Sequence, residues 1–185
     1  MKRYVLALMA IPVLGALLYT FQRVDEGGAI VPVETVALPR YTVYDATLMR
    51  FDNDGAATLR GKATSVAYFD DESGHATNLQ ADTLADDEVT WHLTSPTATM
   101  PAHDRRILLE GPVVANGQWP DTGEDLTVDT TQVWVDTDAH QFDSRQPVKL
   151  QSASRNGTAV GLRVDWQDRR MQLLHNVKMT YAATP

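Results

Sequence analysis

Clusters of turn-forming residues divide the chain from Tyr41 onward into short runs. These clusters are DNDG at 52–55, DDESG at 70–74, ADD at 85–87, NGQWPDTG at 116–123, DTDA at 136–139, SRNG at 154–157 and QDRR at 167–170. Turn signals at this spacing leave room for strands and little room for helices. The chain also contains 18 valines and 20 threonines, whose β-branched side chains favour pleated strands. The sequence therefore predicts an all-β domain of antiparallel strands.

Three segments of this region repeat one pattern: a turn, a strand, a small or polar kink, and then valine. They are residues 104–114, 139–149 and 168–178, aligned at Val113, Val148 and Val177. Leu-x-Val-Asp segments at 126–129 and 162–165 precede the second and third copies. A β unit repeated every 30–35 residues or so is typical of stacked, nearly one-dimensional architectures. The pattern predicts a repeated hairpin.

Apolar residues alternate with polar ones within each copy. The side predicted to be buried carries Ile107, Leu109, Val113, Phe142, Val148, Leu150, Met171, Leu173, Val177, Met179 and Tyr181. The side predicted to face water carries Arg106, Glu110, Lys149, Gln151, Lys178 and Thr180. Because successive side chains of a strand point to opposite faces, this pattern predicts a sheet with one apolar face.

The N-terminal segment Tyr4–Phe21 carries no charge. Eighteen helical residues span about 27 Å, close to the hydrocarbon thickness of a bilayer, so we predict one transmembrane helix over 4–21. Lys2 and Arg3 place residues 1–3 in the cytoplasm by the positive-inside rule. Residues 22–39 are a predicted linker, and 40–185 a predicted domain outside the membrane. A cleaved signal peptide is the alternative, although the apolar run is long for one.

The charge of the remaining chain excludes some functions. Residues 24–185 carry 13 basic and 24 acidic residues, a balance that repels phosphate backbones, so we expect no nucleic-acid partner. The chain has no cysteine, and its five histidines show no metal-ligand spacing. No nucleophile or phosphate-binding motif is present. We therefore expect neither enzymatic activity nor a cofactor or metal.

Residues 52–55 and Asn156–Gly157 are predicted hairpin turns.

The order of several weak motifs resembles the LptC family. They are the N-terminal anchor, Pro39-Arg-Tyr41, Phe51-x-x-x-Gly55, Trp91, Leu108-x-x-Gly-x-Val113, Leu-Thr-Val-Asp129, Pro147-Val148, Gly161-Leu162 and Val177-x-x-x-Tyr181. The resemblance implies a single-pass inner-membrane protein whose periplasmic domain is a twisted, open β-jellyroll like that of LptA. It further implies a non-enzymatic carrier that receives lipopolysaccharide from LptF and LptG, driven by LptB, and passes it to LptA.

A lipid carrier of this kind needs an apolar groove. The predicted groove residues are Tyr41, Phe51, Trp91, Ile107, Leu109, Val113, Val128, Val133, Val135, Phe142, Val148, Leu150, Val164, Met171, Leu173, Val177 and Met179. The same inward parity also describes the core of any β-sandwich. A membrane-tethered adaptor that binds only protein therefore stays open as an alternative. The nearest basic candidates for lipid phosphates are Arg105, Arg106, Arg169 and Arg170.

Two regions are predicted to bind protein partners. The last strand, Met171–Tyr181, is predicted to be an uncovered edge that receives LptA through Lys178, Thr180 and Tyr181. Thr180→Pro is predicted to remove one main-chain donor from that edge. Gly161 matches a family glycine, and the resemblance implies that it faces LptF and LptG. A Gly161→Arg variant is expected to weaken that docking without unfolding the domain.

Overall fold

The computed structural model describes residues 38–52 and 54–182. They form nine β-strands: β1 (Tyr41–Phe51), β2 (Ala57–Tyr68), β3 (Gly74–Ala85), β4 (Glu88–Met100), β5 (Ile107–Gln118), β6 (Asp125–Asp136), β7 (Gln141–Gln151), β8 (Arg155–Asp165) and β9 (Arg170–Tyr181). Within these residues, no helix has the length and hydropathy needed to cross a membrane. The predicted transmembrane segment 4–21, residues 1–3 and most of the linker lie outside the described residues.

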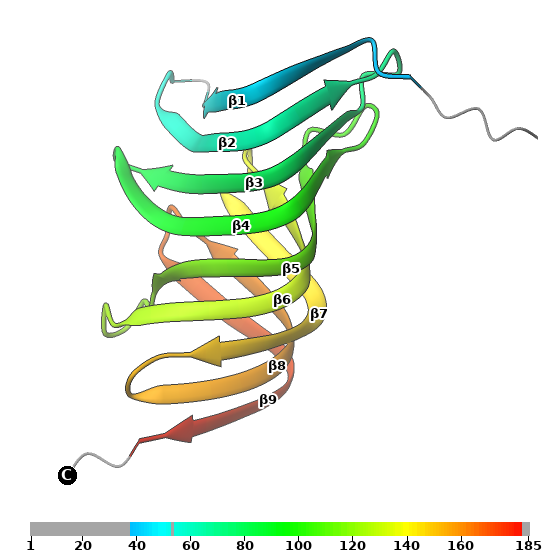
Figure 1. The fold of residues 1–185 in the computed structure, drawn as a ribbon. Helices are drawn as coiled ribbons and strands as arrows, with labels where there is room; N and C mark the ends of the chain where they lie inside the picture. Colours follow the sequence, from blue (N-terminus) through cyan, green and yellow to red (C-terminus); the bar gives the residue numbers. More distant parts are fainter. Residues whose placement is uncertain (1–37, 53, 183–185) are drawn as a thin grey trace, which may run out of the picture. The chain divides into compact units, whose positions relative to one another are not determined.

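The nine strands form one antiparallel sheet in which each strand pairs with its neighbours in sequence, from β1 to β9 (Figure 1). The prediction of an all-β antiparallel domain is confirmed. Short turns favour this strand order, because a turn of a few residues can join two strands only if they pair as antiparallel neighbours. Among the described strands, β1 and β9 are the two edges of the sheet.

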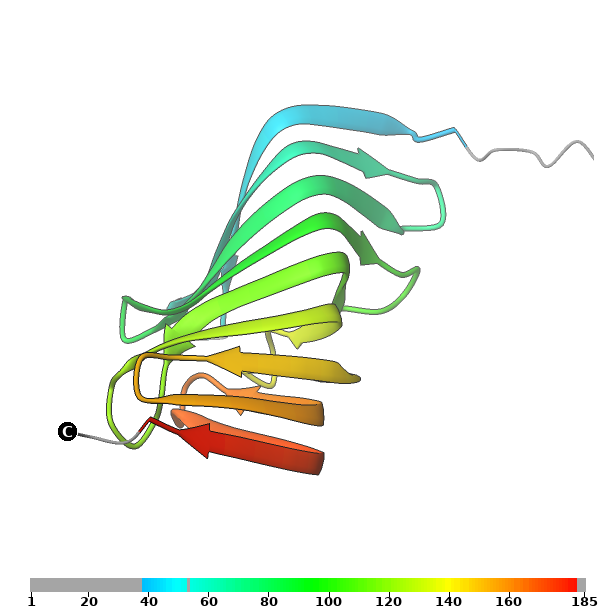
Figure 2. The same ribbon diagram turned by 60° about the horizontal axis from the view of Figure 1, so that its bottom comes forward.

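The strands bend near their middle, so the single sheet folds over into two layers (Figures 1 and 2). Left-handed backbone marks the bends, with positive φ at Asp45, Asn78, Gly111, Gly161 and Asn176. The ladders shift register near the same places, for example between Glu110 and Val113 and between Ser144 and Pro147. Such irregularities re-aim the side chains of a strand.

In several strands the bend exchanges the buried and exposed positions. In β4, odd-numbered Trp91 and Leu93 are buried before Pro96, whereas even-numbered Ala98 is buried after it. The strand therefore keeps its apolar side chains inside both layers. Without the switch, one half of each such strand would direct its apolar residues into water.

One row of small and apolar residues crosses all nine strands in register. It consists of Leu48, Gly61, Ala81, Leu93, Ala115, Val128, Leu150, Gly157 and Met179, each paired with the next. The row lies on the inner face, and its central members Leu93, Val128 and Leu150 are at most 1% exposed. Cross-strand apolar pairs of this kind stabilise the sheet and define its register.

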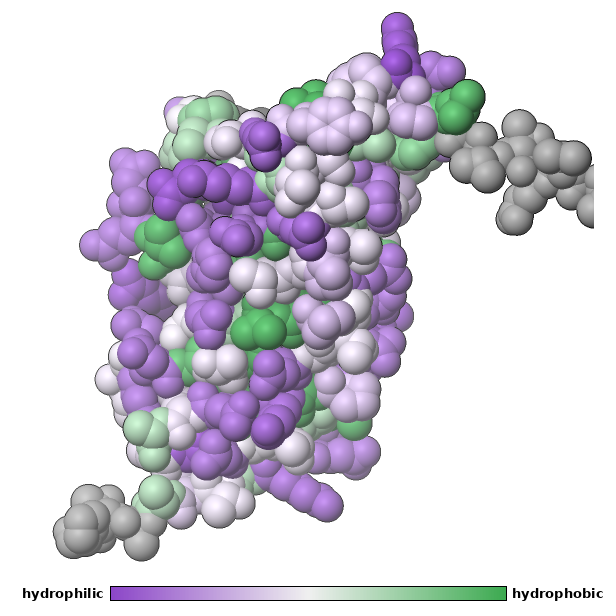
Figure 3. All heavy atoms as spheres, viewed as in Figure 1, coloured by the Kyte–Doolittle hydropathy of each residue, from purple (hydrophilic) through white to green (hydrophobic). Residues whose placement is uncertain are grey.

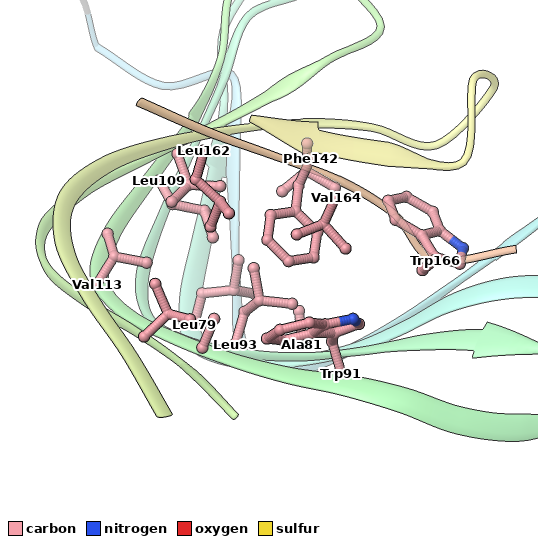
Figure 4. Close-up of a cluster of buried hydrophobic side chains, with 14 of the residues drawn as sticks. Leu79, Ala81, Trp91, Leu93, Leu109, Val113, Phe142, Leu162, Val164 and Trp166 are labelled. Carbon is pink, nitrogen blue, oxygen red and sulfur yellow. The ribbon is translucent and has the colours of Figure 1, made fainter. Parts of the chain in front are cut away.

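The core between the two layers is densely filled with aromatic and aliphatic side chains (Figure 4). The Phe142 ring packs edge-on against Trp91, with centroids 5.2 Å apart, and stacks on Trp166 at 6.4 Å. These three residues come from β4, from β7 and from the turn that follows β8. The aromatic cluster therefore joins elements from both halves of the chain.

The predicted hairpin repeat corresponds only in part to the structure. Its three copies lie on β5, β7 and β9, which are alternate strands of the meander, and each strand contains a bend at the predicted kink. The two Leu-x-Val-Asp segments are not equivalent, however. Residues 126–129 lie at the beginning of β6, whereas 162–165 lie at the end of β8. The bend and the hairpin both recur, as β6–β7 and β8–β9, but the Leu-x-Val-Asp segments occupy different positions in the two hairpins.

The prediction of a turn at Asn156–Gly157 is wrong. The turn lies just before it, where the Ser152 N–H donates to the Arg155 carbonyl at 3.0 Å, and β8 already begins at Arg155. Gly157 is instead a strand residue opposite Met179, and a Cβ there would lie 2.3 Å from the Met179 sulfur. Close packing explains this glycine better than turn geometry. The turn at 52–55 is confirmed, with Gly55 N–H donating to the Asp52 carbonyl.

Candidate functional site

An apolar cleft opens between the two layers at the β1 end of the sheet. It encloses about 240 Å³. Its lining residues are Leu48, Met49, Arg50, Val66, Tyr68, Gly74, His75, Ala76, Leu79, Ala98, Met100 and Ile107. These residues come from the far half of β1 and from the opposite layer of β2 to β5. The cleft is thus one part of the interior that the protein's own side chains leave open.

The predicted groove residues fall into three groups in the structure. Ten are core residues at most 5% exposed: Trp91, Leu109, Val113, Val128, Val133, Val135, Phe142, Val148, Leu150 and Val164. Four are partly buried against that core: Ile107, Met171, Leu173 and Met179. Tyr41, Phe51 and Val177 are exposed on the edge strands. Of all seventeen, only Ile107 lines the apolar cleft, and contact of any of them with lipid stays a prediction.

A second cavity, of about 560 Å³, lies between the layers near the β4–β6 and β8–β9 strand ends. Three tryptophans line it: Trp91, Trp119 and Trp166. We call it the tryptophan pocket. The Nε1 atoms of Trp119 and Trp166 are buried and have no hydrogen-bond partner in the protein. A buried unpaired donor costs about 1–3 kcal/mol, and these two atoms are closed off from the open space of the pocket.

The loop before β6 is held by a cluster of polar contacts. The Arg155 guanidinium lies 4.3 Å from the Trp119 ring centroid and donates to both Asp121 carboxylate oxygens, at 2.9 and 3.0 Å. The Ser154 N–H and hydroxyl both donate to the Glu124 carboxylate. These bonds from Arg155 and Ser154 lower the pKa values of Asp121 and Glu124 below their usual 3.8 and 4.5. The contacts position one wall of the tryptophan pocket.

We expect acid to release this loop. A carboxylate whose pKa is lowered by folding stabilises the fold fully above its unfolded pKa, and that contribution is lost as pH falls through the folded value. The Trp119 environment should therefore change as pH falls below about 4. The Arg106–Asp104 pair beside Trp134 provides a comparison, because hydrogen bonds from Arg106 lower the Asp104 pKa to about 2.

The measurement is the ¹⁹F spectrum of protein labelled with 5-fluorotryptophan, recorded across this pH range. In the control variant Asp121→Asn, the Trp119 signal should already be shifted at neutral pH. A Trp119 signal that moves only together with that of Trp134, near pH 2, would contradict the assignment.

Exposed apolar side chains gather on the two edge strands. On β1 these are Tyr41, Val43, Tyr44, Met49 and Phe51, and on β9 they are Leu174, Val177 and Tyr181. The face seen in Figure 3, by contrast, is largely hydrophilic with scattered hydrophobic patches. Uncovered apolar edges are templates for another strand. Both ends of the sheet therefore have the character of docking surfaces.

The predicted partner-binding residues do not all lie at the free side of β9. The Ala182 N–H donates to the carbonyl of Ser154, the residue just before β8, at 2.8 Å, and Asn156 on β8 is paired with Thr180. Because N–H directions alternate along a strand, Thr180 also donates toward β8, whereas Tyr181 donates away from it. The prediction that Thr180→Pro removes a donor from the free edge is therefore wrong.

Gly161 lies one strand away from the free edge, on β8. It has a φ of 88°, and an added Cβ would lie 3.0 Å from Leu174. Any side chain there meets both backbone strain and crowding. The expectation that Gly161→Arg leaves the domain unperturbed is corrected accordingly. A role in docking stays a prediction.

The four arginines considered for lipid phosphates all lie near carboxylates. The nitrogen-to-oxygen distances are 3.3 Å for Arg105–Asp138, 2.7 Å for Arg106–Asp104, 3.5 Å for Arg169–Glu88 and 3.4 Å for Arg170–Asp168. These acids already supply a counter-charge, so the rim offers little excess positive charge to an anion. In the described part of the chain, no three His, Asp or Glu side chains gather as metal ligands would.

Sequence reasoning missed most of the cleft and two of the three pocket tryptophans. Trp119 lies within the predicted turn NGQWPDTG, and Trp166 directly precedes the predicted turn QDRR. A large aromatic residue beside a turn is the one signal that points to them, because turns seldom need such a side chain. Leu48, Val66 and Met100 carry no signal beyond ordinary strand alternation.

Comparison with known proteins identifies the family. A family model described as lipopolysaccharide-assembly, LptC-related, matches residues 5–182. A crystal structure of LptH from Pseudomonas aeruginosa, the LptA-homologous periplasmic component of its lipopolysaccharide transport device, is similar to this chain with a TM-score of 0.51. The two share 11% identity over 68% of this chain and 95% of LptH. No curated protein sequence gave a match. The fold is thus an LptA-like jellyroll, and the chain belongs to the LptC family of lipopolysaccharide-assembly proteins.

Proposed function

We propose that this protein receives lipopolysaccharide from the inner-membrane subunits LptF and LptG, powered by LptB, and passes it to LptA. Residues 4–21 anchor it in the inner membrane, with 1–3 in the cytoplasm and 22–39 as the linker to a periplasmic domain. The domain has no catalytic role and needs no cofactor. The observation that carries the proposal is an apolar cleft at the β1 end of a sheet whose two edge strands both expose apolar side chains.

The cleft supplies what lipid transfer through water requires. Exposing an acyl chain to water costs about 0.8 kcal/mol per CH₂ group. Leu48, Val66 and Met100 line the cleft from both layers and offer an apolar surface instead. A cleft that meets the β1 edge can continue into a neighbouring jellyroll that pairs with β1, so the chain need not leave an apolar environment.

One observation favours a second candidate function. The interior beyond the cleft is filled by the protein's own side chains, such as Leu109, Phe142 and Trp166, each at most 1% exposed. A protein filled in this way throughout would be a tethered adaptor that binds only other proteins. In the carrier, the layers must separate as lipid moves beyond the cleft.

Photocrosslinking in cells distinguishes the two functions. A benzophenone amino acid at Leu48 or Met100, which line the cleft, is expected to capture lipopolysaccharide detected by blotting. The matched controls are Thr47 on β1, the neighbour of Leu48, and Lys62 on β2, two exposed residues that do not line the cleft. We expect at least about tenfold more lipid adduct at the cleft positions. Equal labelling at all four positions, or none, would favour the adaptor.

A further inference from the structure

We propose that the ion pair between Glu88 and Arg169 is a gate across the open side of the jellyroll, and that it must break for lipid to pass from the β1 end toward β9. This inference rests on the proposed function, because only a carrier has to move lipid along its interior. It assigns a role in transport to two exposed side chains that contribute little to the stability of the fold.

The two layers of the jellyroll are continuous with each other on one side only. The strands cross from one layer to the other at their bends, and the turns between strands lie along the opposite side, which we call the open side. In Figure 4, Val113 lies near the bend of β5, whereas Trp91 and Trp166 lie at the other end of the core cluster, one in each layer. Within the described residues, strands pair only with their neighbours in sequence, so no ladder joins the layers on the open side.

Glu88 and Arg169 lie on opposite sides of this opening. Glu88 begins β4 directly after the β3–β4 turn, and Arg169 lies in the β8–β9 turn. Because each strand runs from one layer into the other, consecutive turns alternate between the layers, and these two turns belong to different layers. A guanidinium nitrogen of Arg169 lies 3.5 Å from a carboxylate oxygen of Glu88, and both residues line the tryptophan pocket. The pair therefore bridges the open side next to that pocket.

The other ion pairs of the described residues each lie within one layer or one turn. His103 and Glu72, for example, join the β4–β5 and β2–β3 turns, which are in the same layer. Arg155 and Asp121 likewise join the β7–β8 and β5–β6 turns of the other layer. In the described part of the chain, closure of the open side by charge therefore depends on a single ion pair.

A lipid carried between the layers has to project its headgroup through the open side. Its acyl chains need the apolar interior, whereas its sugars and phosphates stay in water, because burying polar groups without partners is costly. The apolar cleft lies at the β1 end, so a lipid that moves from there toward β9 passes β4, where Glu88 stands. The headgroup then meets the ion pair that crosses its path.

The pair is suited to opening and closing. The side chains of Glu88 and Arg169 are 75% and 69% exposed. Exposed ion pairs are weak in water and break readily. The gate can therefore open without disturbing the core, where Trp91 and Phe142 pack against each other across the two layers.

The test is photocrosslinking of lipopolysaccharide to the purified full chain. A benzophenone amino acid replaces either Met171, which lines the tryptophan pocket and packs against the core, or Leu48 in the apolar cleft. The chain contains no cysteine, so Glu88→Cys together with Arg169→Cys places the only two thiols across the open side. A short bismaleimide then holds the layers together there, whereas a long, flexible bismaleimide lets them separate.

The short link should abolish lipid labelling at Met171 and preserve labelling at Leu48, whereas the long link should preserve both. The matched control is Glu72→Cys together with His103→Cys. That pair is similarly exposed and 3.6 Å apart, but it lies within one layer, so the short link there should leave labelling at Met171 unchanged. Labelling at Met171 that survives the short link across the open side would overturn the inference.

Charge reversal tests the pair without a cross-link. Glu88→Arg and Arg169→Glu each place like charges across the open side, and each should raise lipid labelling at Met171 about twofold to fivefold. The double variant restores an opposite pair and should return the labelling to the wild-type level. Equal labelling in all four proteins would show that this pair does not control the passage of lipid.

Failure of this inference can be separated from failure of the proposed function. If Leu48 captures lipopolysaccharide while labelling at Met171 is absent or does not respond to the short link, the inference is wrong and the proposed function stands. If neither position captures lipid in the protein without a cross-link, the proposed function is wrong as well.

Discussion

Replacing Leu109 with aspartate is expected to unfold the jellyroll domain at neutral pH. Leu109 is 1% exposed and pairs in register with Ala98 on β4 and Val133 on β6. The substitution removes about 1.5–3 kcal/mol of apolar burial and places an unpaired carboxylate in the core. Together these costs are comparable to the total stability of an ordinary domain, about 5–15 kcal/mol. Circular dichroism and urea denaturation measure the effect.

The control for this experiment is Val177→Asp on the edge strand. Val177 is 45% exposed, so a carboxylate there stays hydrated. We expect the free energy of unfolding to change by less than about 1 kcal/mol. A Leu109→Asp protein with the urea midpoint of the wild type would show that this side chain faces an open channel and not a closed core.

Proline at position 181 is expected to abolish capture of an LptA-type jellyroll at β9. The Tyr181 N–H points away from β8, so it is a donor available to an incoming strand. Proline removes that donor and sets its ring where the partner backbone would approach. Within the described residues no strand pairs with the outer side of β9, so the domain itself loses no ladder bond. Pull-down or interferometry with LptA from the same bacterium measures the loss, which we expect to exceed tenfold.

Two variants make the interpretation of this result specific. Tyr181→Thr removes the aromatic ring but keeps the N–H, and it should retain most of the binding. Thr180→Pro removes a donor to β8, so it should lower the stability of the terminal hairpin as well as the binding. Normal capture of LptA by a folded Tyr181→Pro protein would move the docking edge to β1 or elsewhere.

Deleting residues 177–185 is a less selective experiment than the proline variant. Met179 packs against the core opposite Gly157. Its sulfur occupies the space that a side chain at position 157 would need. Truncation therefore removes core contacts together with the docking edge. Loss of LptA binding after truncation would agree with the proposal, but only the proline variant isolates the edge.

The strand content and the antiparallel order follow from local sequence. Turn clusters such as 52–55 and 167–170 separate β-branched runs, and neighbouring runs joined by short turns pair antiparallel. The buried side of β5 and of β7 was also predictable from alternation. Odd-numbered Leu109 and Val113 are buried in β5, and even-numbered Phe142 and Val148 are buried in β7. These features depend on residues that are close in sequence.

The places where prediction failed are positions at which close packing overrides a local signal. Asn156–Gly157 has the composition of a hairpin turn. The Met179 sulfur occupies the space beside Gly157 in the structure, and the turn forms earlier, at Ser152. The orientation of the Thr180 N–H is a similar case, because it depends on the register of β9 against β8.

The sequence by itself determined the all-β class, the antiparallel character of the sheet, the family and the residues that are apolar. Which apolar residues are sealed in the core and which line open space was decided only by the tertiary structure. Leu109 and Leu48 are both apolar strand residues, yet one is packed between neighbours in the middle of the sheet and the other faces the cleft at its edge. Trp91, Trp119 and Trp166 likewise meet only because the bent sheet brings β4, the loop before β6 and the end of β8 together. Alternation reports the face of a strand, whereas exposure depends on what the opposite layer places against that face.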